Sequence, residues 1–214
     1  MYTPRHKGLT ITGPSPRIWG NLPLFEWSLH NGGFLFFDDF INTPTLNPAS
    51  NLGQYGSYID TGCTIKSLET EIGGVLKMNH DGTDNDEISI TTGGNTGVMT
   101  TIDHATPQIV AFEARIKKSS IANDGIAFFV GLSEEAMAVA DTMVDDTGAM
   151  ADKDFIGFRN LHVDGSLMDF VYKKAGQTLQ TKIASVQTMV AGTFYRLGFL
   201  YNPFDHDNSK KIKI

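Results

Sequence analysis

The sequence IVAFEARIKKSSIANDGIAFFVGL, residues 109–132, decides the fold class. In FEARIK, residues 112–117, apolar and charged side chains alternate strictly, which is the two-residue period of a strand with one buried face. Residues 119–125 form a polar segment with the turn residues Asn, Asp and Gly, and residues 126–132 are an almost wholly apolar run. Such a run suits a strand buried on both faces or lying at the centre of a sandwich. The pattern predicts a β-hairpin at the heart of an all-β protein.

Length and composition agree with a sizeable all-β core. The chain has 214 residues, 41% of them hydrophobic, and 14 are Phe, so one main domain can bury a real core. The net charge of −7 argues against a nucleic-acid partner, because phosphate binding needs clustered Lys and Arg. No apolar run approaches the roughly 18 residues of a membrane helix, and the first 16 residues lack the apolar centre of a secretory signal. We therefore expect neither a nucleic-acid nor a membrane partner.

Short strands separated by turn residues fill the rest of the chain, and they predict a two-sheet antiparallel sandwich over residues 34–214. The final residues, KIKI, alternate between polar and apolar as the first part of a strand does. We therefore expect either a strand at a sheet edge or a polypeptide that continues past Ile214. Further strands are predicted at residues 34–41, 57–66, 74–78, 87–91, 155–159, 167–173, 178–184, 194–202 and 210–214. The predicted core residues are Phe112, Ile116, Phe128, Val130, Phe158, Phe170, Leu197 and Phe199.

Residues 1–33 differ from the rest and predict an extended N-terminal arm. They hold four of the eight prolines, which remove backbone donors and disfavour a central strand, together with too much apolar area for a solvated tail. Such an arm packs either on its own domain or on a neighbouring subunit, and we expect the second as an assembly contact. Its candidate contact residues are basic or large and apolar: Arg5, Lys7, Arg17, Trp19, Phe25 and Trp27.

Residues 133–154 read as an acidic insertion on the sandwich. They contain seven acids and one base, Lys153. Ser133 followed by Glu134 and Glu135 is typical of a helix N-cap with acids in the first turn, so a short helix is predicted over residues 134–143. The acidic insertion could receive the basic arm.

Two local clusters of acids are candidate metal sites. The sequence NHDGTDNDE, residues 79–87, contains Asp81, Asp84 and Asp86, which are hard oxygen ligands of the kind Ca²⁺ binds. Their spacing does not fit an EF-hand, and Asp and Asn are ordinary turn residues, so solvated turns are expected here and at residues 205–208. The six histidines show no zinc-binding spacing, and the single cysteine, Cys63, is predicted to be a buried small hydrophobe. We expect no cofactor and no metal requirement for folding.

No catalytic motif is present. The sequence lacks G-x-S-x-G, and the paired carboxylates of a sandwich glucanase, E-x-D-x-x-E, do not occur. Strand tyrosines could stack on a sugar, but most are expected to pack as core or cross-strand pairs. The candidates for sugar stacking are Tyr55, Tyr58, Tyr172, Tyr195 and Tyr201.

The succession VAFEARIKKSS…DGIAFFVGLSEE, DFIGFRN, SLMDFVYKKAG and GTFYRLGFLYN…KKIKI resembles the concanavalin A-like jelly-roll superfamily. In that superfamily a charged alternating strand is followed by an apolar one, and a late Y-R-L-x-F-x-Y strand precedes a K-x-x-I strand. The resemblance covers residues 34–214 and implies a jelly-roll sandwich. Its members include lectins, glucanases and structural modules of viral particles, and this chain lacks the metal-ligand run of the lectins and the paired glutamates of the glucanases.

These features favour a non-enzymatic structural protein of a virion. We expect a capsid decoration or tail-associated subunit of a tailed bacteriophage, whose partners are copies of itself and other virion proteins. A carbohydrate-binding module with glycan partners is the alternative, and a polysaccharide hydrolase is the third possibility.

Overall fold

The computed structural model describes residues 16–19, 35–40, 55–68, 74–83, 86–92, 108–122, 126–143, 149–207 and 211–214, and within these ranges the fold is all-β with antiparallel pairing. No helix in the described ranges is long and apolar enough to cross a membrane. In chain order the elements are α1 (Pro16–Trp19), β1 (Tyr55–Ile59), β2 (Thr64–Ser67), β3 (Leu76–Asn79), β4 (Ile88–Thr92), β5 (Val110–Lys117), β6 (Phe128–Ser133), β7 (Phe155–Asn160), the 3-10 turn η1 (His162–Asp164), β8 (Leu167–Lys173), β9 (Gln180–Thr188), β10 (Phe194–Tyr201) and β11 (Ile212–Lys213).

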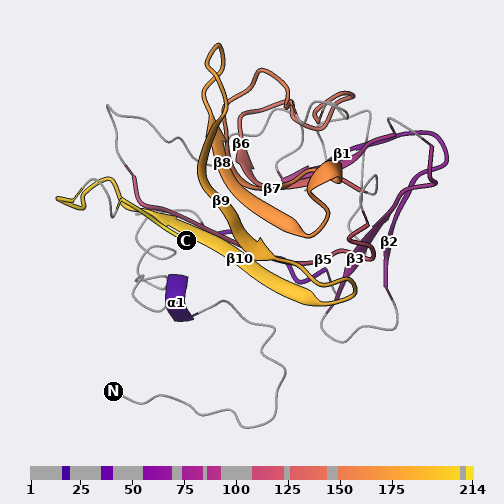
Figure 1. Ribbon diagram of the computed structural model, residues 1–214, viewed down its shortest axis with the longest axis horizontal. Helices are drawn as coiled ribbons and strands as arrows, with labels where there is room; N and C mark the ends of the chain where they lie inside the picture. Colours follow the sequence, from indigo (N-terminus) through magenta and orange to yellow (C-terminus); the bar gives the residue numbers. More distant parts are fainter. Residues whose placement is uncertain are drawn as a thin grey trace, which may run out of the picture.

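Two sheets pack face to face and enclose the principal core (Figure 1). One has the strand order β11-β10-β5 and the other β6-β7-β8-β9. Their facing side chains interdigitate, so that Phe199 of β10 lies against Phe158 and Phe170 of the second sheet, with ring centroids 6.5 and 5.4 Å apart. All eight predicted core residues belong to this cluster, which confirms the sandwich-like core. Its fully enclosed members are Phe158, Met168, Phe170, Met189, Leu197 and Phe199.

The outer face of the four-stranded sheet carries a second, outer core. Phe129, Phe155 and Val171 point to this side and meet methionines from the segment between β6 and β7. Gly131 and Gly157 face each other across β6 and β7, and a Cβ on either would crowd the ring of Phe129. The apolar run in β6 therefore packs on a core with each of its faces, although its residues are only partly buried.

The predicted hairpin between residues 112–117 and 126–132 is wrong. Both strands form, but β5 pairs with β10 and β6 pairs with β7, so the connection crosses from one sheet to the other. Along this crossing Lys118 is buried and Ile121 packs on the principal core. Strand periodicity identifies which face of a strand is buried but not which strand is its partner. A hairpin and a crossing between two sheets therefore have the same sequence pattern.

The helix predicted over residues 134–143 is also wrong. Ala136 and Asp141 have φ of 59° and 58°, which no helix allows, and the hydroxyl of Thr142 donates to the carbonyls of Met137 and Val139. Met137 is buried in the outer core, and the next residue, Ala138, is buried as well. Packing of these apolar side chains outweighs the weak helix preference of the segment.

Residues 35–40 do not form the strand predicted over residues 34–41. Phe40 has a φ of 54°, and Asp38 accepts hydrogen bonds from the Phe40 amide and from the buried Tyr55 hydroxyl. The rings of Phe36 and Phe40 pack on Tyr55 at centroid distances of 5.9 and 5.8 Å. This segment is held by an aromatic cluster and a carboxylate instead of a strand ladder.

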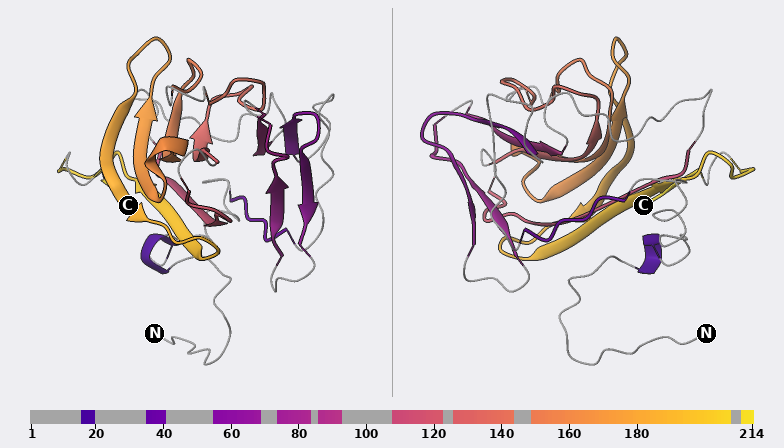
Figure 2. Two further views of the ribbon diagram at one scale, coloured as in Figure 1. Left: turned by 45° about the vertical axis from the view of Figure 1, so that its right-hand side comes forward. Right: turned by 180° about the vertical axis from the view of Figure 1, so that it is seen from behind.

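The four short strands before the sandwich form two nested pairs, which lie side by side next to the main sheets (Figure 2). β2 pairs with β3, and this hairpin lies within the connection between β1 and β4, which also pair. The single strand predicted over residues 57–66 is thus two strands, because a turn interrupts it after Asp60. That turn leads into Cys63, which lies near His80 and Asp86.

Candidate functional site

The turn between β1 and β2 joins the ends of two ladders. The Cys63 amide donates to the Asp60 carbonyl at 3.1 Å, and Gly62 between them has a φ of 88°, a conformation that favours glycine. The carboxylate of Asp81 fills the space that a Cβ on Gly62 would occupy. Asp60 extends the β1–β4 pairing through its bond to Glu87, while Cys63 comes directly before the first pair of the β2–β3 ladder. The turn therefore brings residues of both strand pairs to one place.

Three different metal-ligating side chains converge there: Cys63, His80 and Asp86. One ligand atom from each lies within 4.8 Å of the others. The pairing of Thr64 with Asn79 places the next residues, Cys63 and His80, opposite each other, and Asp86 arrives just before β4. The Cys63 thiol is 3.8 Å from an Asp86 carboxylate oxygen and the cysteine is only 8% exposed.

Hydrogen bonds fix the ring of His80. Nδ1 accepts from the Gly82 amide at 2.9 Å, so Nε2 carries the proton and donates to the Asp86 carbonyl at 3.0 Å. In this tautomer the free lone pair of the ring is on Nδ1. A neutral, oriented imidazole is the form that binds metal ions.

Carboxylates surround this group, and we name Asp60, Cys63, His80, Asp81, Asp86 and Glu87 together the acidic cluster. Burial raises the pKa of the Cys63 thiol. Burial and the hydrogen bond with Asp81 raise the pKa of Asp86, while the amide of Thr83 holds the pKa of Asp81 below its ordinary value.

Two further contacts tie the acidic cluster to its surroundings. Asp60 accepts from the Tyr58 hydroxyl and from the Glu87 amide, both at 2.7 Å. Burial raises the pKa of Glu87, although its carboxylate accepts the Thr142 amide at 2.9 Å. That last contact links the acidic cluster to the insertion that covers the outer core.

The structure brings together some predicted metal candidates and adds others. Asp81 and Asp86 lie side by side, whereas Asp84 falls outside the described residues. Cys63 is buried as predicted, but its thiol faces a carboxylate instead of apolar side chains. His80 was missed because its partners lie 17 residues before it and six after, and only the β2–β3 register makes them neighbours.

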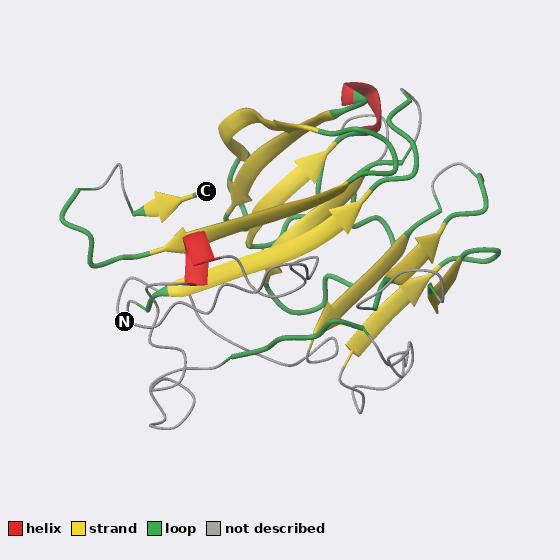
Figure 3. Ribbon diagram, turned by 90° about the horizontal axis from the view of Figure 1, so that it is seen from below, coloured by secondary structure: helices red, strands yellow, loops and turns green. Residues whose placement is uncertain are grey.

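The described part of the N-terminal arm lies on its own sheet. α1 rests across the outer face of β10 and β5 (Figure 3), and a Cβ added to Gly198 would overlap the side chain of Ile18. This corrects the expectation of an extended backbone at residues 16–19, since Pro16 opens a single helical turn whose φ suits that position. Of the predicted arm residues only Trp19 has a described side chain, and Arg17 is described by its backbone. The others, Arg5, Lys7, Phe25 and Trp27, lie outside the described residues.

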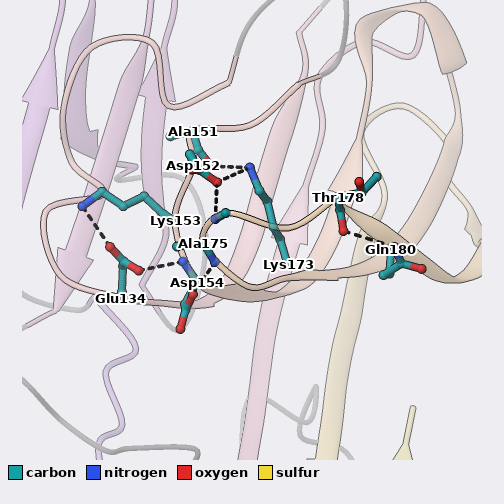
Figure 4. A network of polar contacts seen from close by, with 10 residues as sticks. Glu134, Ala151, Asp152, Lys153, Asp154, Lys173, Ala175, Thr178 and Gln180 are labelled. Carbon is teal, nitrogen blue, oxygen red and sulfur yellow. Dashed lines mark hydrogen bonds and ion pairs between the residues drawn. The ribbon is translucent and has the colours of Figure 1, made fainter.

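A second polar network fastens the insertion to the turn between β8 and β9 (Figure 4). Lys153 pairs with Glu134 at 2.9 Å, and Lys173 pairs with Asp152 at 3.0 Å. Asp152 also accepts the Gly176 amide, and this bond and Lys173 hold the pKa of Asp152 below its ordinary value. Glu134, Asp152 and Asp154 thus accept from backbone amides, and the first two also pair with lysines nearby.

The tyrosines proposed for sugar stacking are mostly engaged elsewhere. Tyr55 is buried, Tyr58 bonds Asp60, and the Tyr195 hydroxyl accepts the Val190 amide at 2.9 Å. Tyr201 is half-buried, and Tyr172 on β8 is 40% exposed. At the second acidic segment, Asp205 accepts the Asp207 amide at 3.1 Å, which is the contact of an ordinary Asp turn.

A buried lysine, Lys118, directly follows β5. Lys118 is 5% exposed, and its ammonium donates to the Asn160 side chain at 2.5 Å and to the Gly165 carbonyl at 3.5 Å. Burial lowers the pKa of Lys118. The fully buried Asn160 amide in turn donates to the carbonyls of Gly165 and Leu167, so a single network joins β5, β7 and β8.

Comparisons of the chain with protein family models, with curated proteins and with solved structures found no match, so the residues above carry the functional argument by themselves.

Proposed function

We propose that this chain is a non-enzymatic structural subunit of a viral particle, a capsid decoration or tail-associated protein of a tailed bacteriophage. In this proposal its sandwich is a concanavalin A-like jelly roll that contacts copies of itself and other virion proteins. The observation that supports it is the position of the arm: the short helix α1 packs on one face of a sheet, where Ile18 lies over Gly198.

The sheet surface under α1 can hold an arm from the same chain or from a neighbouring one. Ile18 lies over Gly198, and the sheet face around it carries charged side chains, with Glu113 and Arg196 paired at 3.5 Å. The indole nitrogen of Trp19 is buried and has no hydrogen-bond partner among the described residues, which costs about 1–3 kcal/mol. In this proposal the arm passes to a second copy in the assembly.

Exposed apolar side chains offer a second contact surface. Val163, Leu167 and Val190 are 52%, 40% and 56% exposed. They belong to neighbouring turns and strand ends, since Leu167 pairs with Thr188 and the Met189 amide donates to Ser166. Neighbouring apolar side chains that are exposed to solvent are typical of interaction sites on proteins.

Assembly state tests the proposal directly. Light scattering coupled to size-exclusion chromatography should show a symmetric homo-oligomer, a trimer or larger, without added ligand. Deletion of residues 1–27 and the substitution Ile18→Glu should both reduce it to a folded monomer with an unchanged far-ultraviolet spectrum. Phe204→Ser, at an exposed turn, is the matched control and should leave the oligomer intact.

Two results would overturn the assembly proposal. One is a protein that stays monomeric at every concentration tested. The other is an oligomer that Ile18→Glu leaves unchanged, because the arm would then have no part in assembly.

Carbohydrate binding is the alternative, and exposed Tyr172 is the observation that favours it. Aromatic rings presented at a surface can stack on sugar faces. Saturable binding on a glycan array that is lost in Tyr172→Ala would support this alternative over assembly.

A further inference from the structure

We propose that Cys63, His80 and Asp86 form a binding site for a divalent cation of the zinc class, with Asp81 or a water molecule as the fourth ligand. This inference is independent of the assembly role. It rests on which side chains the fold brings together and on the charge that surrounds them.

The three ligands come from three separate segments that the fold holds in register. Cys63 follows the Gly62 turn, His80 follows β3, and Asp86 precedes β4. Backbone pairing fixes the first two opposite each other, and the amide-to-carbonyl bond from Asp60 to Glu87, 3.1 Å long, anchors the third. Ligands held by strand ladders are more precisely placed than ligands on a free loop.

The local charge favours a cation. The acidic cluster contains four carboxylates: Asp60, Asp81, Asp86 and Glu87. In the described parts of the chain, no Lys or Arg forms an ion pair with any of them. A bound dication would offset the repulsion between these acids.

The ligand types select the zinc class over calcium. A thiolate, an imidazole and a carboxylate are the sulfur, nitrogen and oxygen donors of zinc sites, whereas Ca²⁺ takes oxygen alone. Zinc bond lengths of about 2.0–2.3 Å require ligand atoms about 3.5 Å apart. The present separations of up to 4.8 Å close to that value with side-chain movements of about an ångström.

Binding makes two demands on the site. The Cys63 thiol must release its proton, because the thiolate is the ligand. One of the two hydrogen bonds on the His80 ring must open, and the contact that remains orients the ring. The bond to open is the one from the Gly82 amide, because it occupies Nδ1, the ring nitrogen without a proton.

Cobalt is the most selective probe because the chain has one cysteine. Titration of the full chain with Co²⁺ should produce a thiolate-to-cobalt charge-transfer absorption that reports Cys63 alone, and Zn²⁺ should abolish it by displacement. Cys63→Ser should lose this absorption completely. His80→Ala and Asp86→Asn should weaken zinc binding about tenfold or more, measured by competition with a chromogenic chelator.

The second acidic segment provides the matched control. His206→Ala and Asp205→Asn change the same residue types at the turn after β10 and should leave cobalt and zinc binding unchanged. A wild-type chain without charge-transfer absorption overturns the proposal, even if the cysteine variant fails to fold. It is also overturned if Ca²⁺ raises the melting temperature as much as Zn²⁺ does, since the site would then be an oxygen site for hard cations.

Discussion

The principal core and the acidic cluster are held together by opposite means. In the core, rings from two sheets interlock and three phenylalanines are at most 1% exposed. In the acidic cluster a turn, two short ladders and a set of hydrogen bonds hold polar side chains of the same sign close together. Burial of apolar surface is non-directional and tolerates many sequences. The convergence of Cys63, His80 and the nearby acids needs a specific backbone, and holding carboxylates close together costs free energy.

Emptying the principal core should have the largest effect on stability. Phe170→Ala removes a fully buried ring that contacts Phe158 and Phe199, so we expect the free energy of unfolding to fall by about 3–5 kcal/mol. Urea denaturation measures this. The control is Tyr172→Ala on the same strand, which should cost less than about 1 kcal/mol because the ring is exposed. Equal losses for the two variants would contradict the assignment of the core face.

The turn at Gly62 should show the next largest effect. Gly62 and Gly82 both have positive φ, 88° and 98°, but a Cβ meets the Asp81 carboxylate only at Gly62. Gly82→Ala therefore incurs backbone strain alone, about 1–2 kcal/mol, and Gly62→Ala should cost more because it also displaces Asp81. Comparing the thermal unfolding of the two variants separates the cost of backbone strain from the cost of displacing Asp81. If Gly82→Ala is the more damaging change, the packing of Asp81 over Gly62 does not hold.

The smallest effect concerns Lys118, a buried cation bound by neutral oxygens. Its pKa is lowered by burial, so the unfolded chain binds more protons than the folded one between the folded pKa and the ordinary value of about 10.4. Stability should therefore rise with pH through that window, relative to Lys118→Met. Chemical denaturation of both proteins across the alkaline range measures the difference. If the stability of the wild type relative to Lys118→Met falls as pH rises, the folded structure stabilises the charged form of Lys118.

Hydrophobic periodicity in the sequence was enough to predict the β class, most strand positions and all eight core residues. It did not identify strand partners, so the crossing between β5 and β6 was taken for a hairpin. It also missed positions where one polar contact overrides local preference, such as Asp38 beneath Tyr55 or Thr142 in the insertion. The ligand group was missed for the same reason, because Cys63, His80 and Asp86 become neighbours only through backbone register.

The pairing of β5 with β10 has a consequence for how the chain folds. Val110 pairs with Tyr201 and Lys117 with Phe194, so β5 leaves the ribosome long before its partner is made. Contacts so distant in sequence are slow to form, and an apolar strand that waits unpaired invites aggregation. The outward side chains of β5 carry Glu113, Arg115 and Lys117, and such charges on a waiting strand discourage pairing with other chains. The alternation that marks this strand in the sequence therefore also protects the nascent polypeptide.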